Sequence, residues 1–320
     1  MKKALTTLAL STVSVLALAA CGTGDTAASS SAASDDGALK IVTTTDVYAD
    51  LVKAVGGDKV EVTPLIASTA VDPHSYEASS QDRLTVKDAD LVVVNGGGYD
   101  TFLTDMAGAD NPDQVVVNAV ELSDLFSAED LAHMAEEHGD HAEGEEHVHT
   151  YNEHVWYDLD TMKKVADQIA TDLGELDPAN ADAYTQAAAA FSGEADTLLT
   201  QLEAINTEER TYLATEPVSG YLLEDAGFSD ATPSDLTAAV DSESDIAPLT
   251  LQEVKDTLTD GSVDLLSFNE QTQTSQTSEI YTFAREAGVP AVSFTETLPE
   301  NTGYLDWMTT NIDNLEKAVA

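Results

Sequence analysis

Apolar residues along the chain fall into short continuous runs separated by polar segments of helical length. Such runs predict strands at residues 39–42, 60–66, 90–95 and 115–117. The run LVVV in the third of these has no polar interruption, as in strands buried on both faces of a sheet. Between the first two runs, residues 46–55 are predicted to form a helix capped by Asp46. This alternation favours a parallel sheet covered by helices.

A longer apolar stripe, with steps of three and four, extends through residues 178–206. Its members are Ala181, Tyr184, Ala188, Phe191, Ala195, Leu198, Leu202 and Ile205. The pattern predicts a helix of ~43 Å, at about 1.5 Å per residue, that starts at the Asp177-Pro178 pair. A coiled-coil dimer would use the same stripe, but alanine at several of its positions disfavours that interpretation.

Beyond the long helix, the strand and helix patterns recur. Strands are predicted at residues 211–215, 263–268 and 291–294, with helices at 249–258 and 278–287. The acidic residues 232–248 are predicted to be a surface connection. The fold class is therefore α/β, with two βα lobes of mainly parallel sheets joined by one long, rigid helix.

Three consecutive glycines, Gly96 to Gly98, follow the LVVV run. The chain contains neither GxGxxG nor GxxxxGK[ST], so a phosphate-binding loop is disfavoured. A tight turn into a helix at residues 99–106 is the preferred interpretation.

The first residues have the pattern of an export signal. Lys2 and Lys3 precede a short apolar stretch that ends in LAAC, which is similar to a bacterial lipobox. Cys21, the only cysteine, would then carry a lipid anchor and leave none for a disulfide. We expect an extracytoplasmic, membrane-anchored protein. The predicted organisation is a signal peptide at 1–20, a flexible tether at 21–37, a first lobe at 38–177, the linking helix at 178–206 and a second lobe at 207–320.

The formal net charge of −46 excludes nucleic acid as a natural partner and repels anionic lipid headgroups. It concentrates cations near the surface, although solubility or salt tolerance would explain the same charge.

Six of the seven histidines lie between residues 133 and 154, among acidic residues. Imidazole is a common ligand for Zn²⁺, Cu²⁺ and Ni²⁺, and this spacing suits a flexible multidentate loop at residues 133–149. The candidate auxiliary ligands in the loop are His133, His138, His141, His147 and His149. A solvated insertion rich in histidine by chance is the alternative.

The remaining histidine, His74, occurs in VDPHSYE, after the second predicted strand. The Asp72-Pro73 pair favours an extended or turned loop there. Ligands of α/β sheets bind beyond the carboxyl ends of strands, which makes His74 a candidate ligand as well as a candidate structural residue.

Five separated segments resemble the zinc- and manganese-binding substrate-binding proteins of bacterial ABC transporters. They are VDPHSYE, ADLVVVNGGGYDTFL, EHVWYDLD, TEPVSGYLLEDAGF and VSFTETLPENTGYLDWMTTNIDNL, in the family's order. The resemblance implies one metal ion in the cleft between the lobes, with two ligands from each. The residues that match the family's ligands are His74, His154, Glu216 and Glu296. Glu270 in FNEQT is the nearest rival to the last of these.

The resemblance implies a receptor that binds Zn²⁺, or Mn²⁺ as the alternative, and delivers it to an ABC permease and its ATPase. Glutamate as the third ligand is typical of manganese members, whereas the histidine loop and intrinsic affinity favour zinc. We expect a monomer without catalytic activity. A metal-dependent adhesin or metal buffer stays open, and a metallohydrolase is disfavoured because HExxH is absent and a fourth ligand closes the site. Metal binding through two imidazoles is expected to weaken below about pH 6–6.5.

Overall fold

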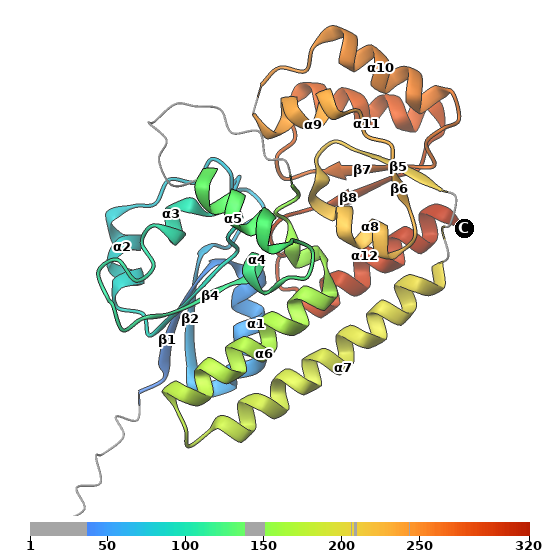
Figure 1. The fold of residues 1–320 in the computed structure, drawn as a ribbon. Coiled ribbons are helices and arrows are strands. Elements are labelled where there is room, and N and C mark those ends of the chain that lie inside the picture. The colour runs from blue at the N-terminus through green and yellow to red at the C-terminus, as the bar shows by residue number, and fades with distance from the viewer. Residues whose placement is uncertain (1–36, 138–150, 206, 208–209, 243) are drawn as a thin grey trace, which may run out of the picture. The chain divides into compact units, whose positions relative to one another are not determined.

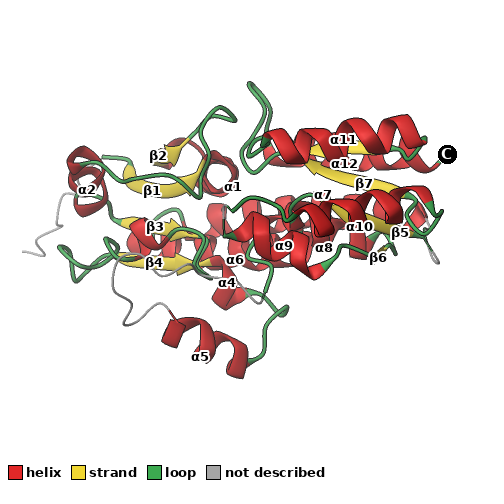
Figure 2. Cartoon of the chain, turned by 90° about the horizontal axis from the view of Figure 1, so that it is seen from above, coloured by secondary structure: helices red, strands yellow, loops and turns green. Residues whose placement is uncertain are grey.

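Two parallel sheets organise the chain in the computed structural model, which describes residues 37–137, 151–205, 207, 210–242 and 244–320. Figure 1 and Figure 2 show each sheet with its own surrounding helices. We call the part around the first sheet the first lobe and the part around the second sheet the second lobe. The predicted α/β fold with two parallel-sheet lobes and one long helix is confirmed.

The first sheet has the strand order β2-β1-β3-β4. Its strands are β1 (Leu39–Thr45), β2 (Val60–Ile66), β3 (Leu91–Val94) and β4 (Val115–Asn118). All neighbouring strands run parallel. Every residue of β3 is buried, as the uninterrupted run of apolar β-branched residues predicts for an inner strand.

The second sheet has the strand order β6-β5-β7-β8 and is also parallel. Its strands are β5 (Thr211–Ala214), β6 (Ser229–Asp230), β7 (Leu265–Asn269) and β8 (Ala291–Phe294). The register pairs Asn269, the last residue of β7, with Phe294, the last residue of β8. The chain segments that leave β5, β7 and β8 therefore emerge at one edge of this sheet.

Helices connect the strands in both lobes. The α-helices are α1 (Asp46–Gly56), α2 (Ser80–Lys87), α3 (Thr101–Thr104), α4 (Ala119–Leu122), α5 (Ala128–Glu137), α6 (Leu159–Leu176), α7 (Ala181–Ile205), α8 (Gly220–Asp225), α9 (Ser234–Asp241), α10 (Pro248–Thr259), α11 (Ser275–Ala287) and α12 (Tyr304–Val319). Short 3-10 turns occupy Gly57–Lys59, Val155–Tyr157 and Pro217–Ser219. None of the helices within the described ranges is long and apolar enough to cross a membrane.

The long helix α7 has 25 residues and packs against helices of both lobes. It runs beside α6 and also contacts α1, α8 and α12 (Figure 1). The buried residues of the predicted stripe are Tyr184, Ala188, Phe191, Ala195, Leu198 and Leu202. The stripe is therefore covered by helices of its own chain, as expected for a linking helix. The helix begins at Ala181 and not at Pro178, because the Asn180 N–H donates to the Asp177 carbonyl and closes a separate turn first.

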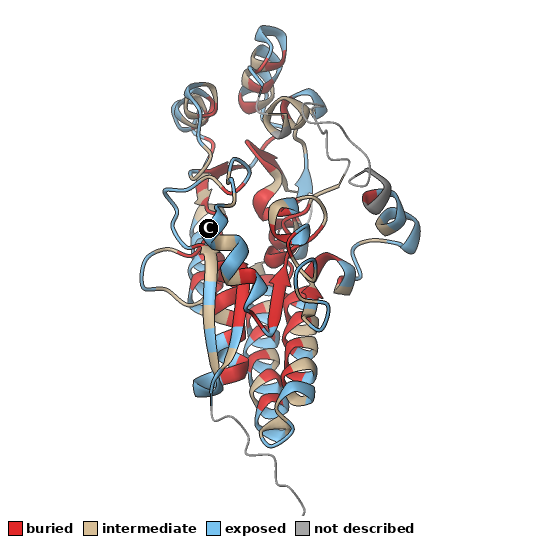
Figure 3. Ribbon diagram, turned by 90° about the vertical axis from the view of Figure 1, so that its left-hand side faces the viewer, coloured by how far each residue is buried: buried red, intermediate tan, exposed pale blue. Residues whose placement is uncertain are grey.

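One hydrophobic core continues from the first lobe into the second. Tyr157, which follows His154 by three residues, packs against Phe294 of β8 and Trp307 of α12. Phe191 of α7 packs against Tyr304 at the start of α12. Figure 3 shows this shared interior in red, with exposed residues in pale blue on the outer faces of the helices. A continuous core of this kind opposes large movements of one lobe against the other.

Three local predictions were wrong. Asp46 does not cap α1, since the N-cap is Thr45 and the Asp46 carboxylate accepts a hydrogen bond from the Leu298 N–H of the second lobe. The helix predicted at residues 99–106 is reduced to α3, because a turn follows the glycines. Residues 232–248 contain the helix α9, whose core-facing Leu236 is fully buried.

Candidate metal site between the two lobes

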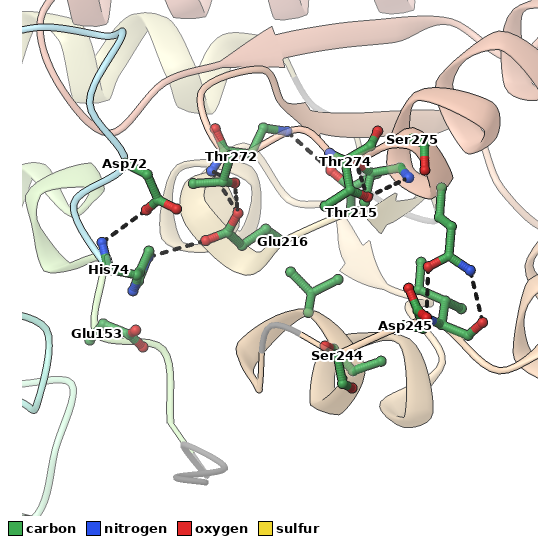
Figure 4. Close-up of a pocket in the computed structure, with 16 residues that line it drawn as sticks. Asp72, His74, Glu153, Thr215, Glu216, Ser244, Asp245, Thr272, Thr274 and Ser275 are labelled. Atoms are coloured by element: carbon green, nitrogen blue, oxygen red, sulfur yellow. Dashed lines mark hydrogen bonds and ion pairs between the residues drawn. The ribbon is translucent and has the colours of Figure 1, made fainter. Parts of the chain in front are cut away.

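His74 lies on the loop that follows β2, at the carboxyl end of the first sheet. Its backbone N–H donates to Asp72 Oδ1 at 2.9 Å, which closes a short turn around Pro73. The side chain of His74 is 25% exposed, and its Nε2 atom faces the carboxylates of the second lobe. Figure 4 shows the imidazole turned toward Glu216 across the gap between the two chain segments.

His154 immediately precedes the 3-10 turn Val155–Tyr157 and is buried. Its Nδ1 lies 2.7 Å from Asn152 Oδ1, while Asn152 Nδ2 donates to the Pro217 carbonyl at 2.8 Å. Because the amide oxygen of Asn152 can only accept, Nδ1 of His154 carries a proton, and Nε2 is the nitrogen that would bind a metal ion. The imidazole is thus oriented with Nε2 toward the two carboxylates, 3.9 Å from each.

The two glutamates follow two strands of the second sheet, β5 and β8, that lie on either side of β7. Glu216 comes two residues after β5 and immediately before the 3-10 turn Pro217–Ser219, and Glu296 comes two residues after β8. Both side chains are buried, and Glu296 is fully so. The carboxyl edge of a parallel sheet is where α/β proteins bind ligands, and here it carries both carboxylates.

One donor atom from each of these four residues lies within 4.8 Å of the other three. His74 Nε2 is 3.3 Å from Glu216 Oε1 and 3.2 Å from Glu296 Oε2. His154 Nε2 is 3.9 Å from each of the same two oxygens. Zinc bonds of about 2.0–2.1 Å in a tetrahedron separate the ligand atoms by about 3.3 Å. The four imidazole–carboxylate distances, 3.2 to 3.9 Å, are close to this value.

The charges of the group are strongly coupled. Burial alone would lower the pKa of His74, but the charges and hydrogen bonds of Glu296 and Glu216 outweigh it and raise the pKa well above 6.5. Burial likewise acts to raise the pKa of Glu216, but the hydrogen bond and charge of His74 hold it well below its usual value. A proton on His74 therefore stabilises these carboxylates when no cation is present, and a metal ion would replace it.

Uncharged groups hold the carboxylates. Tyr99 donates to Glu296 Oε2 at 3.0 Å, and Thr272 donates to Glu216 Oε2. Asn269 at the end of β7 donates to both glutamates, at 2.6 and 2.8 Å. Sequence reasoning missed these three positions. The only hint was the proximity of Asn269 to Glu270 in FNEQT.

Hydrogen bonds between the lobes fix the backbone next to the ligands. Tyr221 of α8 donates to the Asn152 carbonyl at 2.5 Å, and Tyr157 donates to the Thr295 carbonyl at 2.7 Å. Each bond joins the segment of one candidate ligand to an element of the other lobe. These bonds therefore fix the position of the first-lobe ligands relative to the second-lobe ligands.

A cavity of about 270 Å³ adjoins the donor group. His74, Glu216 and the carboxylates of Asp72, Glu153 and Asp245 are among its lining residues. Figure 4 shows these side chains around the space between the two lobes. A cation that approaches the donors through this cavity meets acidic side chains before it reaches them.

The rival carboxylate does not belong to the group. Glu270 is exposed and lies outside the set of clustered donors. His133 lies on helix α5 and not on a loop, and it is also outside that set among the described residues. The other loop histidines, His138, His141, His147 and His149, lie outside the described residues, as does Cys21.

The fold and site together define a class: a two-lobed α/β protein that presents two imidazoles and two carboxylates to one point between its lobes. The comparisons with known proteins give the family. The chain belongs to the family described as ZnuA, zinc-uptake complex component A, periplasmic, whose model matches residues 41–318.

The proteins to which this chain is similar include two lipoproteins and one periplasmic protein. The manganese ABC transporter substrate-binding lipoprotein PsaA of Streptococcus pneumoniae is 32% identical over 197 residues, which are 60% of this chain and 57% of PsaA. The manganese-binding lipoprotein MntA of Halalkalibacterium halodurans is 29% identical over 72% of this chain and 74% of its own length. The periplasmic zinc-binding protein TroA of Treponema pallidum has the same fold, with a TM-score of 0.70 at 21% identity over 89% of this chain and all of TroA. The alignment with PsaA thus spans little more than half of that relative.

Proposed function

We propose that this protein is the extracytoplasmic substrate-binding component of a metal ABC transporter, and that its cargo is Zn²⁺. The proposal is carried by one observation, the convergence of His74, His154, Glu216 and Glu296 within 4.8 Å in the cleft between the lobes. Two neutral imidazoles and two carboxylates balance the charge of a divalent cation, which lowers the free energy needed to bury it.

The donor types and their spacing support zinc over manganese. The four atoms match a tetrahedron more closely than the larger shell of oxygens that Mn²⁺ prefers. Intrinsic affinity for such nitrogen and oxygen ligands is also greater for Zn²⁺ than for Mn²⁺. The family description names zinc, whereas the relatives PsaA and MntA are named for manganese, and the latter metal is the alternative.

Delivery of the ion requires partners in the membrane. We propose a permease and its ATPase as these partners, a lipid on Cys21 as the anchor after removal of residues 1–20, and a monomeric receptor without catalytic activity. The shared core and the hydrogen bonds between the lobes support release by local movement of ligand-bearing loops, since they oppose a wide opening of the cleft.

The histidine segment at residues 133–149 has a separate proposed role. It gathers Zn²⁺ weakly and passes it to the four-residue site. Deletion of this segment should reduce uptake under zinc starvation and leave uptake at high zinc unaffected. Equal uptake by the full-length and deleted proteins under zinc starvation would contradict this role of the segment.

Gene disruption in the source organism tests the proposal directly. The disrupted strain should stop growing in medium treated with a chelator, and added Zn²⁺ should restore growth at a lower concentration than Mn²⁺. The unaltered chain should complement the defect, and Glu296→Gln should not, because it removes one ligand charge without changing shape. Glu270→Gln is the matched control and should complement fully. Growth unaffected by the disruption, or rescue only by Mn²⁺, would contradict the proposal.

A further inference from the structure

Asn269 occupies a position that touches both candidate carboxylate ligands. The strand order places β7 between β5 and β8, so its last residue lies between the segments that carry Glu216 and Glu296. The Asn269 side chain is buried, and its Nδ2 donates to Glu216 Oε2 at 2.6 Å and to Glu296 Oε1 at 2.8 Å. One amide group therefore bridges the two acids.

The orientation of this amide is fixed by its surroundings. Asn269 Oδ1 accepts a hydrogen bond from the Gln271 N–H at 3.0 Å, which leaves Nδ2 directed at the carboxylates. Nδ2 also lies 2.7 Å from Thr272 Oγ1, and the Thr272 hydroxyl donates to the same Glu216 oxygen. Glu216 Oε2 is thus engaged by two neutral donors at once.

The two oxygens of each glutamate have different neighbours. The oxygens bound by Asn269 are Glu216 Oε2 and Glu296 Oε1, whereas Glu216 Oε1 and Glu296 Oε2 are the ones near His74 and His154. A glutamate that binds a metal through both oxygens must turn its outer oxygen toward the ion. That rotation would break a charge-assisted hydrogen bond between the carboxylate and the buried amide, which is unfavourable.

We propose that Asn269 is a positioning residue that limits each glutamate to one metal-facing oxygen and thereby sets the selectivity of the site. This inference rests on the proposed function for the presence of a metal ion. Four single-atom ligands suit Zn²⁺, whereas Mn²⁺ prefers about six, mostly oxygen, ligands. Asn269 thus selects against Mn²⁺ by withholding the two extra oxygens that would complete its shell.

The test compares coordination and selectivity in three variants. The reference is the full chain with alanine at His138, His141, His147 and His149, so that the loop binds no metal. Co²⁺ serves as a spectroscopic probe, because its visible absorption is intense with four ligands and weak with six. Competition between Zn²⁺ and Mn²⁺ for the same site gives the ratio of their dissociation constants.

Asn269→Ala is expected to convert an intense Co²⁺ spectrum into a weak one and to reduce the preference for Zn²⁺ over Mn²⁺ at least tenfold. Thr272→Val, at a half-buried position, removes the second hydrogen bond to Glu216 Oε2 and the contact of Thr272 Oγ1 with Asn269 Nδ2, but leaves the Asn269 amide in place. It should shift both readouts in the same direction by less. This variant decides the question if Asn269→Ala does not fold. Tyr99→Phe is the matched control, because it removes a hydrogen bond from the metal-facing oxygen of Glu296. Its Co²⁺ spectrum should remain that of a four-ligand site, whatever its affinity.

The outcomes separate this inference from the proposed function. An unchanged spectrum and an unchanged Zn²⁺/Mn²⁺ ratio in Asn269→Ala, or in Thr272→Val if that is the variant that folds, would overturn the role of Asn269 and leave the receptor intact. A weak Co²⁺ spectrum in the reference chain would also overturn it, since the site would then have more than four ligands with Asn269 present. A reference chain that binds no metal ion stoichiometrically would refute the proposed function itself, and with it the inference.

Discussion

Competition between protons and metal ions at His74 should make affinity depend on pH over an unusually wide range. In the metal-free protein the pKa of His74 is well above 6.5, because the attraction of Glu296 and Glu216 exceeds the opposing effect of burial. The imidazole is therefore protonated throughout the range from pH 5.5 to 6.5 and into the neutral range. A metal ion must displace this proton before it can bind Nε2.

The size of the effect follows from this pKa. Each unit of pH below the pKa of a displaced proton weakens binding about tenfold, or about 1.4 kcal/mol. Between pH 7.5 and 5.5 the loss from His74 should exceed the loss of about tenfold that an imidazole with the ordinary pKa of about 6.5 would show. The weakening therefore begins above the range of about pH 6–6.5 expected from ordinary imidazoles.

Two measurements on the chain without loop histidines check this prediction. Competition with a chelator of known proton affinity gives the Zn²⁺ dissociation constant at each pH. Calorimetry at pH 6.5 in buffers of different ionisation enthalpy gives the number of protons released, which should be at least about one per ion. A loss of tenfold or less, together with release of much less than one proton at pH 6.5, would show that His74 is neutral before binding, contrary to this prediction.

Three further predictions concern the fold around the site. Phe191→Ala should lower the free energy of unfolding by about 3–5 kcal/mol in urea titrations, because it empties a buried position of α7 against Tyr304; a change below 1 kcal/mol would contradict the shared core. Asp50→Ala should lower the free energy of unfolding by about 1–3 kcal/mol and weaken Zn²⁺ binding. Asp50 accepts a hydrogen bond from the backbone N–H of the buried Tyr304 at 2.8 Å and so attaches the loop after Glu296 to α1. Unaltered Zn²⁺ binding would show that this attachment does not position the metal site. The free energy of unfolding of the metal-free chain should fall as the pH rises from 5 to 8. Burial raises the pKa of Asp46 to about 6 and that of Asp225 to about 7, so ionisation of each carboxyl opposes folding. A free energy of unfolding that increases over this interval would contradict these shifts.

The sequence predicted the elements whose signals are local. Continuous apolar runs located the strands, and β2 and β8 have the predicted bounds. The stripe of α7 identified its buried face, although the turn at Asp177 shifted the start of the helix. The helix α9 was missed, because the acidic residues of the surrounding segment conceal the buried Leu236.

The donor group could not be derived from spacing. Its members are more than 60 residues apart in sequence, and only the resemblance to a known family brought His154 and Glu296 together with the rest. The bridging position of Asn269 was inaccessible for another reason. It depends on β7 lying between β5 and β8, and this strand order is fixed by packing of the whole lobe.

Native mass spectrometry of the metal-free chain, with alanine in place of the four loop histidines, is the most direct test of the central claim. Equimolar Zn²⁺ and Mn²⁺ are offered, and the mass of the folded protein reports which ion is bound and how many. We predict one Zn²⁺ per chain, lost in Glu216→Ala and retained in Glu270→Ala. One Mn²⁺ per chain would contradict the choice of metal, and the absence of any stoichiometric ion would contradict the four-residue site itself.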